Sequence, residues 1–259
     1  MLCSYEICES ESIALYTNKG VCQYRECRGD LLYILSDRMA FSVGKDLLLK
    51  LRNELQTFFH SNRKRHLKVE EVESIISLCR HLGPEHFNLS VKNPFGKLGF
   101  TSVTYQHIWE SKSVSMGIFV LSPGASIPLH DHPGMTVISR ILYGSLRIRS
   151  FDFAPLQSDD GLLGILRQDS TISAPSTTAL SPTCGNIHEF LADGIEGCAI
   201  FDILAPPYNT EEGRDCSYYK VDEEKVSHLG KEYYRLKKYT PTDFRVQSAP
   251  YRGPQMTGT

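Results

Sequence analysis

Apolar residues in the N-terminal third of the chain recur with the period of an α-helix. Between residues 43 and 59 they fall every three or four positions, with charged residues between them. A second segment, 69–81, repeats the pattern and is followed by Gly83 and Pro84, which end helices. The spacing predicts two amphipathic helices whose apolar sides pack on a core rather than bind a ligand.

After residue 93 the pattern changes to short β-branched and aromatic runs separated by glycine and proline. The predicted strands are 103–109, 115–121, 136–141, 145–151 and 198–204. Strands of this length and spacing are typical of an all-β sandwich or barrel. Aspartate and glycine residues within 158–168 predict a loop or hairpin that borders the functional site rather than building it. The expected fold is therefore mainly β, with helices on its N-terminal side.

These patterns divide the chain into four parts. Residues 39–86 are the helical region that packs on the barrel, 87–251 are the β domain, and 252–259 are a tail. Residues 1–38 show neither period, so we expect a poorly structured or variable segment. Four cysteines in it form two C-x4-C pairs, which leave a zinc site open as the less favoured alternative.

Charge and composition narrow the possible functions. A formal net charge of −2 over 259 residues gives no basic face for nucleic acid. No apolar stretch reaches the roughly 18 residues that span a bilayer, and the acidic start suits neither a secretory nor a mitochondrial leader. The expected location is cytoplasmic, where the eight cysteines stay reduced.

Three histidines are the strongest chemical signal. His130 and His132 lie two residues apart in GASIPLHDH, at the expected start of a strand, so alternation points both imidazoles to one face. His188 follows a glycine in PTCGNIH and leads into another apolar run. The three rings converge if the barrel closes. We expect the remaining histidines to be ordinary surface or core residues: His60, His66, His81, His86, His107 and His228.

The spacing from Gly124 through the histidine pair to Gly144 resembles the first motif of cupins, whose fold is a double-stranded β-helix or jelly-roll barrel. The sequence GNIH around His188 resembles part of the second motif, although its proline lies one residue too far from the glycine. The first motif normally has a carboxylate four residues after its second histidine. In this sequence that place is taken by Thr136 and Val137, which carry no carboxylate. The sequence therefore predicts a metal site made of three histidines.

Three neutral imidazoles leave the 2+ charge of a metal to be balanced by the substrate, and a thiolate suits this role. Imidazole fits iron, zinc or copper, so ligand type alone does not choose the metal. A facial set of three ligands leaves open positions where a thiolate and dioxygen bind side by side. This arrangement favours redox-active Fe(II), one per chain, with O2 as co-substrate and no organic cofactor.

Longer blocks around these residues resemble one family of cupins. The blocks IPLHDHPGMTVISRILYG, GNIH, FDILAPPY and GRDCSYY are similar in order and spacing to the 2-aminoethanethiol (cysteamine) dioxygenase and plant cysteine oxidase family. The similarity covers about residues 87–251 and is clearest over 103–220. It implies an Fe(II)-dependent thiol dioxygenase that converts cysteamine, or the N-terminal cysteine of a protein, to a sulfinic acid, a reaction tied to hypoxia sensing.

The resemblance also implies four catalytic residues. Asp202 would orient a ligand imidazole or accept a proton from the substrate, the alternative being a buried structural carboxylate. Tyr208 would gate the pocket or hydrogen-bond the substrate, the alternative being a packing role in its Pro-Pro-Tyr corner. Cys216 and Tyr218 match positions that form a thioether crosslink in some relatives. The alternative for this pair is a buried free thiol beside a core tyrosine.

Two other functions stay open. A non-catalytic cupin would use its barrel as a ligand-binding pocket, and a zinc or manganese cupin isomerase would use another metal. The three histidines argue against the first, and the missing carboxylate argues against the second. The expected partner is a small aminothiol or a protein with an N-terminal cysteine, with no nucleic acid and no membrane. A monomer is expected, because no further exposed apolar stripe is evident.

Overall fold

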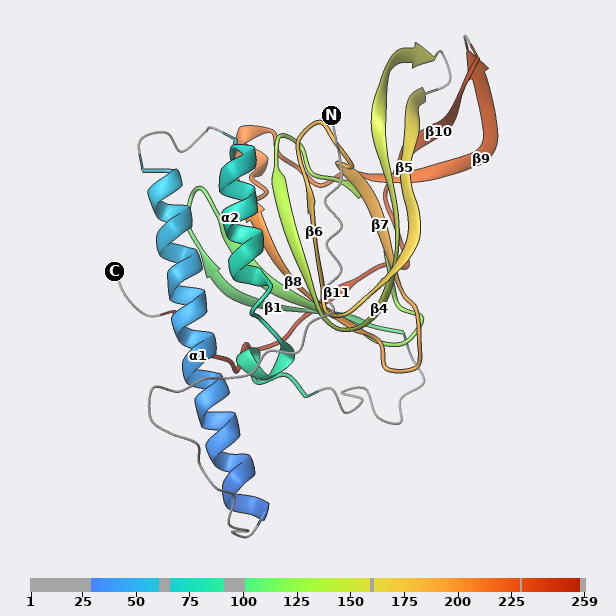
Figure 1. The fold of residues 1–259 in the computed structure, drawn as a ribbon. Helices are drawn as coiled ribbons and strands as arrows, with labels where there is room; N and C mark the ends of the chain where they lie inside the picture. The colour runs from blue at the N-terminus through green and yellow to red at the C-terminus, as the bar shows by residue number, and fades with distance from the viewer. Residues whose placement is uncertain (1–28, 61–65, 91–100, 159–160, 229, 257–259) are drawn as a thin grey trace.

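The computed structural model describes residues 29–60, 66–90, 101–158, 161–228 and 230–256. The helices α1 (Gly29–Phe58) and α2 (Val69–Cys79) come first and lie side by side across one face of a barrel (Figure 1). The helix α2 agrees with the predicted segment. In contrast, α1 begins at Gly29 rather than at residue 43. The prediction missed its first turns because the apolar residues at 31–35 are consecutive and so show no helical period. The two C-x4-C pairs lie outside the described residues.

The remainder of the chain is built almost entirely from strands. The strands are β1 (Val103–Glu110), β2 (Ser115–Leu121), β3 (Ser126–Asp131), β4 (Thr136–Ser158), β5 (Gly161–Ser173), β6 (Ser176–Leu180), β7 (Ile187–Ala192), β8 (Cys198–Ala205), β9 (Tyr218–His228), β10 (Lys231–Tyr239) and β11 (Val246–Ser248). Of two short 3-10 helices, η1 (Pro84–Phe87) lies between α2 and β1, and η2 (Thr210–Glu212) lies between β8 and β9. The predicted mainly β fold is confirmed.

The long strand β4 joins the two sheets of the barrel. Its first part pairs with β6 and β8, and its second part pairs with β5 and β7. The strand order is β11-β1-β2-β8-β4-β5-β10-β9-β3-β7, with β6 alongside β4. This is the double-stranded β-helix of cupins. The two strands predicted at 136–141 and 145–151 are parts of this one strand.

Strand β8 is buried on both faces, because one face looks into the barrel and the other meets the helices. Outward residues such as Phe201 pack with Leu51 of α1 and Ile75 of α2 in one apolar cluster. Inward residues such as Ile200 belong to a second cluster that fills the barrel and includes Phe190 of β7. Burial of the outward side chains of β8 stabilises the helix pair on the barrel, and burial of the inward ones stabilises the barrel itself.

Buried Arg140 of β4 ties the end of the helical region to the barrel. Its guanidinium donates to the carbonyl oxygens of Arg80 (2.6 Å) and Leu82 (3.1 Å) and to the hydroxyl of Thr177 of β6 (3.1 Å). The carbonyls at the end of a helix lack partners within that helix, so an arginine that caps them keeps them from being buried unsatisfied.

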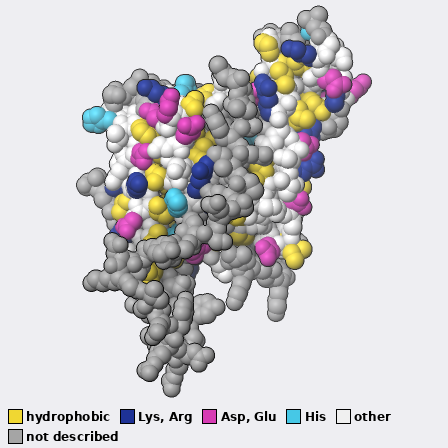
Figure 2. Space-filling view, in the orientation of Figure 1, with side chains coloured by type: hydrophobic (Ala, Val, Ile, Leu, Met, Phe, Trp, Pro, Cys, Tyr) yellow, Lys and Arg dark blue, Asp and Glu magenta, His cyan; other side chains and the backbone are white. Residues whose placement is uncertain are grey.

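The hairpins β4–β5 and β9–β10 extend together beyond the barrel (Figure 1). The described residues of the segment 158–168 belong to this β4–β5 hairpin, as one of the two predicted forms, and Arg167 and Gln168 of β5 line a cavity that also includes His188. Basic, acidic and apolar side chains are interspersed over this lobe (Figure 2), so this face shows no single sign of charge. Neither described α-helix combines the length and apolar character needed to cross a membrane.

Candidate metal centre

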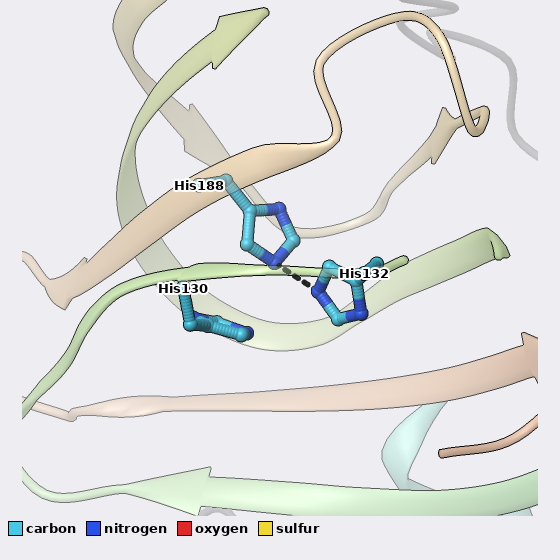
Figure 3. A group of neighbouring side chains, drawn as sticks. All are labelled: His130, His132 and His188. Atoms are coloured by element: carbon cyan, nitrogen blue, oxygen red, sulfur yellow. Dashed lines mark hydrogen bonds between the residues drawn. The ribbon is translucent and has the colours of Figure 1, made fainter. Parts of the chain in front are cut away.

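The three predicted histidines converge inside the barrel (Figure 3). His130 is near the end of β3, His132 follows that strand, and His188 is the second residue of β7. His130 and His188 are direct partners in the β3–β7 pairing. The placement of the pair at the start of a strand was wrong, since β3 delivers it at its C-terminal end. The six other histidines do not join this group.

The ligand nitrogens lie close enough to share one ion. The Nε2 atoms of His132 and His188 are 3.0 Å apart, and all three candidate donor atoms lie within 4.8 Å of one another. The ring centroids are 4.8 Å apart in each pair. All three side chains are buried. Among the described residues, no carboxylate or thiol joins them, which agrees with the three-histidine site read from the sequence.

Hydrogen bonds on the outer ring nitrogens leave the inner nitrogens free to bind a metal. Nδ1 of His130 donates to the carbonyl oxygen of Pro128 at 2.9 Å. The hydroxyl of Tyr208 lies 2.8 Å from both the carbonyl oxygen of Asp131 and Nδ1 of His132. Because that carbonyl can only accept, the hydroxyl donates to it and accepts from His132 Nδ1–H. Both Nε2 atoms therefore keep a lone pair for a metal.

Electrostatics keep these imidazoles neutral. Burial lowers the pKa of His130, and it lowers the pKa of His132 and His188 well below the usual value. Positive charge on a neighbouring ring would lower the last two further. At neutral pH all three are unprotonated, the form that binds metals. The donor set, its convergence and its protonation state fit a divalent transition metal.

The Tyr208 hydroxyl orients the imidazole of His132, a role that the sequence did not reveal. We expect Tyr208→Phe to weaken metal binding about tenfold, because His132 loses the acceptor that fixes its tautomer and ring orientation. Titration of the metal-free protein with Co²⁺ against a competing chelator measures this. Tyr143→Phe is the matched control, since the buried Tyr143 hydroxyl has no hydrogen-bond partner among the described residues. Equal affinities in the two variants would contradict this role for Tyr208.

Asp202 is a buried carboxylate on the inward face of β8, which it shares with Ile200. It hydrogen-bonds Ser139, while its Oδ1 atom has no partner among the described residues. Burial raises the pKa of Asp202 to about 7. The structure shows no hydrogen bond from it to a ligand imidazole, so the unpartnered oxygen is available to a molecule inside the barrel.

Cys216 and Tyr218 lie beside the metal ligands on the β9 side of the barrel. The Cys216 thiol is hydrogen-bonded with the hydroxyls of both Tyr208 and Tyr218. The Tyr218 ring lies 6.1 Å from the ring of His130. The structure therefore brings together the two side chains that would form a thioether, and it records Cys216 as a free thiol. Burial raises the pKa of both groups.

Two residues that hydrogen-bond the segments around the ligands were missed because their partners are far away in sequence. The carboxylate of Asp131 accepts from the Ser217 backbone N–H and the Tyr219 hydroxyl, each at 2.8 Å, and so joins β3 to the start of β9. The side chain of Asn186 bonds the backbone of His132. The available signals in the sequence were Asp131, an acidic residue between two ligands, and Asn186, a polar residue two positions before the third. Neither signal indicates which residue the side chain bonds.

A cavity of about 330 Å³ opens beside His188. Its wall includes Ser139 and Ile148 of β4, Phe190 of β7 and Cys184 of the preceding loop. The wall mixes these apolar side chains with polar ones such as Arg167 and Gln168 of β5, so the cavity offers a small substrate both apolar contact and hydrogen bonds next to a ligand histidine. Together, the barrel and its three converging histidines define a metal-binding cupin.

Comparison with known proteins identifies the family. Residues 63–256 match the family described as PCO_ADO. The 2-aminoethanethiol dioxygenase of Mus musculus is 35% identical over 220 residues, covering 72% of this chain and 85% of that protein. Plant cysteine oxidase 1 of Arabidopsis thaliana is 37% identical over 162 residues, covering 58% of this chain and 55% of that protein. The chain belongs to the PCO_ADO family, as its sequence blocks predicted, and so to the thiol dioxygenase type of oxidoreductase.

A solved structure from Klebsiella pneumoniae is also similar to this chain. It is an uncharacterized conserved protein with a double-stranded β-helix domain, 16% identical, with a TM-score of 0.35. The likeness covers 50% of this chain and 88% of that one.

Proposed function

We propose that this protein is an Fe(II)-dependent thiol dioxygenase whose substrate is an aminothiol, either cysteamine or the N-terminal cysteine of a protein. The convergence of three buried imidazoles, with no carboxylate or thiol among the described residues of the group, carries the proposal. Three neutral ligands leave the 2+ charge of a metal to be balanced by a thiolate substrate, and a facial set leaves open positions for the thiolate and dioxygen. Oxidation of a thiol by dioxygen needs a redox-active metal, which favours iron over zinc.

The reaction adds both atoms of O2 to sulfur, so that RSH and O2 give RSO2⁻ and H⁺. Bound Fe(II) would supply adjacent positions for the thiolate and dioxygen, together with the redox chemistry that joins them. The chain's own residues hold and orient the ligands: Pro128 and Tyr208 fix two imidazoles. The unpartnered oxygen of Asp202 is suited to bind the substrate ammonium or to take the thiol proton.

Several properties are part of the same proposal. One Fe(II) per chain, a cytoplasmic location and a monomeric state follow the expectations from the sequence. The relatives' names, 2-aminoethanethiol dioxygenase and plant cysteine oxidase, support both substrate types. Oxidation of a protein N-terminal cysteine by O2 would make the reaction a sensor of hypoxia.

Mass spectrometry tests the substrate class directly. We expect the Fe(II)-loaded protein to add two oxygen atoms to cysteamine and to peptides that begin with cysteine, and to act poorly on free cysteine and on the acetylated peptides. A free amine next to the thiol gives a second point of attachment, which reduces the entropy lost in positioning sulfur. Equal oxidation of an acetylated peptide would defeat the amine requirement. Iron binding without oxygen uptake for any thiol would favour a non-catalytic cupin.

Asp202→Asn is expected to retain iron and to slow turnover. Because burial raises the pKa of Asp202 to about 7, this carboxyl is mainly neutral at pH 6 and ionised at pH 8. Its contribution to kcat/KM therefore rises as pH increases through about 7, and the asparagine variant lacks that step. The measurement is the ratio of wild-type to variant kcat/KM for cysteamine between pH 6 and pH 8. A ratio that does not change with pH would return Asp202 to a structural role.

A further inference from the structure

The β3–β7 ladder stops one residue short of a metal ligand. It pairs His130 with His188 and Asp131 with Ile187. In this register the next backbone pair would be His132 with Asn186, yet β3 ends at Asp131 and β7 begins at Ile187. His132 therefore lies beyond the part of the sheet that fixes the other two ligands.

The side chain of Asn186 occupies the position of the missing backbone pair. Its Oδ1 accepts from the His132 backbone N–H at 3.1 Å, and its Nδ2 donates to the His132 carbonyl oxygen at 2.7 Å. Nδ2 also donates to the carbonyl oxygen of Ser181 at 3.2 Å. Asn186 is buried, so these bonds form away from water, where an unmade bond is costly.

The loop before His188 has a second attachment, which does not reach a ligand. The Gly185 backbone N–H donates to Asp152 of β4, whose other carboxylate oxygen meets Arg167 of β5. That contact anchors the loop to β4, the strand that pairs with β7 on the side away from β3. Within the described part of the chain, it is the side chain of Asn186 that joins the segment carrying His188 to the backbone of His132.

We propose that Asn186 is a positioning residue of the metal centre, which fixes His132 relative to His188 and so sets the separation of their Nε2 atoms. Two directional bonds to one residue restrain both its translation and its rotation, as a ladder pair does. This role of Asn186 belongs to the three-histidine site itself. It holds whichever thiol is oxidised and whichever divalent metal is bound.

The chemistry of the contact selects a carboxamide of this length. Aspartate would turn a second acceptor towards the carbonyl oxygens of His132 and Ser181, where a donor is needed. Glutamine keeps both groups but adds a methylene, which displaces them. Alanine leaves the His132 N–H without the Asn186 acceptor and removes one of two donors to the His132 carbonyl oxygen, which also accepts from the Met135 N–H at 3.1 Å.

The test uses Asn186→Ala and Asn186→Gln, with metal affinity and Co²⁺ absorption as readouts. Asn88→Ala is the control: its side chain bonds the Arg252 carbonyl oxygen, its φ is 56°, and it lies outside the metal site. This control lowers stability without touching a ligand. Thermal unfolding of each metal-free protein, followed by circular dichroism, reports whether the fold is kept.

We expect Asn186→Ala to raise the metal dissociation constant about 10–100-fold and to change the intensity of the Co²⁺ visible bands. Asn186→Gln should show a smaller change in the same direction, and Asn88→Ala should keep wild-type affinity and spectrum. A folded Asn186→Ala protein with wild-type affinity and spectrum overturns the proposal. If that variant does not fold, wild-type affinity in Asn186→Gln overturns it. An equal loss of affinity in Asn88→Ala also overturns it, because general destabilisation would then explain the effect.

Discussion

Replacing His188 with alanine is expected to remove bound metal and abolish thiol-dependent oxygen uptake, the largest functional loss that we predict. The variant loses one of three donors, and the described residues offer no other carboxylate, thiol or imidazole in the group to replace it. Disturbing a residue behind a ligand typically costs 10–100-fold in metal affinity, so losing the ligand itself should cost more than about 100-fold.

The fold should survive this change. His188 is neutral and sits next to Phe190, whose ring centroid is 4.2 Å from its own, so alanine removes packing but leaves no buried charge. The measurements are metal content by mass spectrometry and oxygen consumption with cysteamine. His107→Ala is the matched control, because His107 is an exposed histidine of β1 outside the metal group. Wild-type iron content in His188→Ala would remove this residue from the ligand set.

The ligands could be predicted from the sequence, whereas the residues that orient them could not. A histidine pair two residues apart, followed by a glycine-led third histidine, has a spacing that belongs to a known fold. Tyr208 acts on His132 across 76 residues, and Asn186 acts on it across 54. Such pairs are set by how two strands meet, and neither local pattern nor composition carries that information.

The fold shows the same division between local and long-range information. Periodicity located α2 and the strands β1, β2 and β8, since each has a regular alternation or a bounded apolar run. It missed the first turns of α1, where the apolar run is continuous. It also divided β4 in two at Gly144, because a glycine inside a strand pattern looks like a turn until its partners are known.

Gly144 is the position where β4 passes from one sheet to the other, and its backbone requires a glycine. Residues before it pair with β8 and β6, and residues after it pair with β5 and β7. Its φ is +78°, in the left-handed region that favours glycine. A Cβ atom here would overlap the carbonyl oxygen of Gly197 and press on the Cα of Cys198, and both are backbone atoms that cannot rotate away.

We therefore expect Gly144→Ala to lower the free energy of unfolding by about 3–5 kcal/mol, a large share of the 5–15 kcal/mol typical of a domain. Left-handed strain accounts for about 1–2 kcal/mol of this loss. The rest comes from moving β8 away from β4. Gly230→Ala separates the two effects, because Gly230 has a φ of +73° and open space where its Cβ would lie. Urea unfolding of the metal-free proteins at 25 °C measures both variants. Equal losses would mean that backbone strain alone, and not the contact with Gly197, makes glycine necessary at the junction of the two sheets.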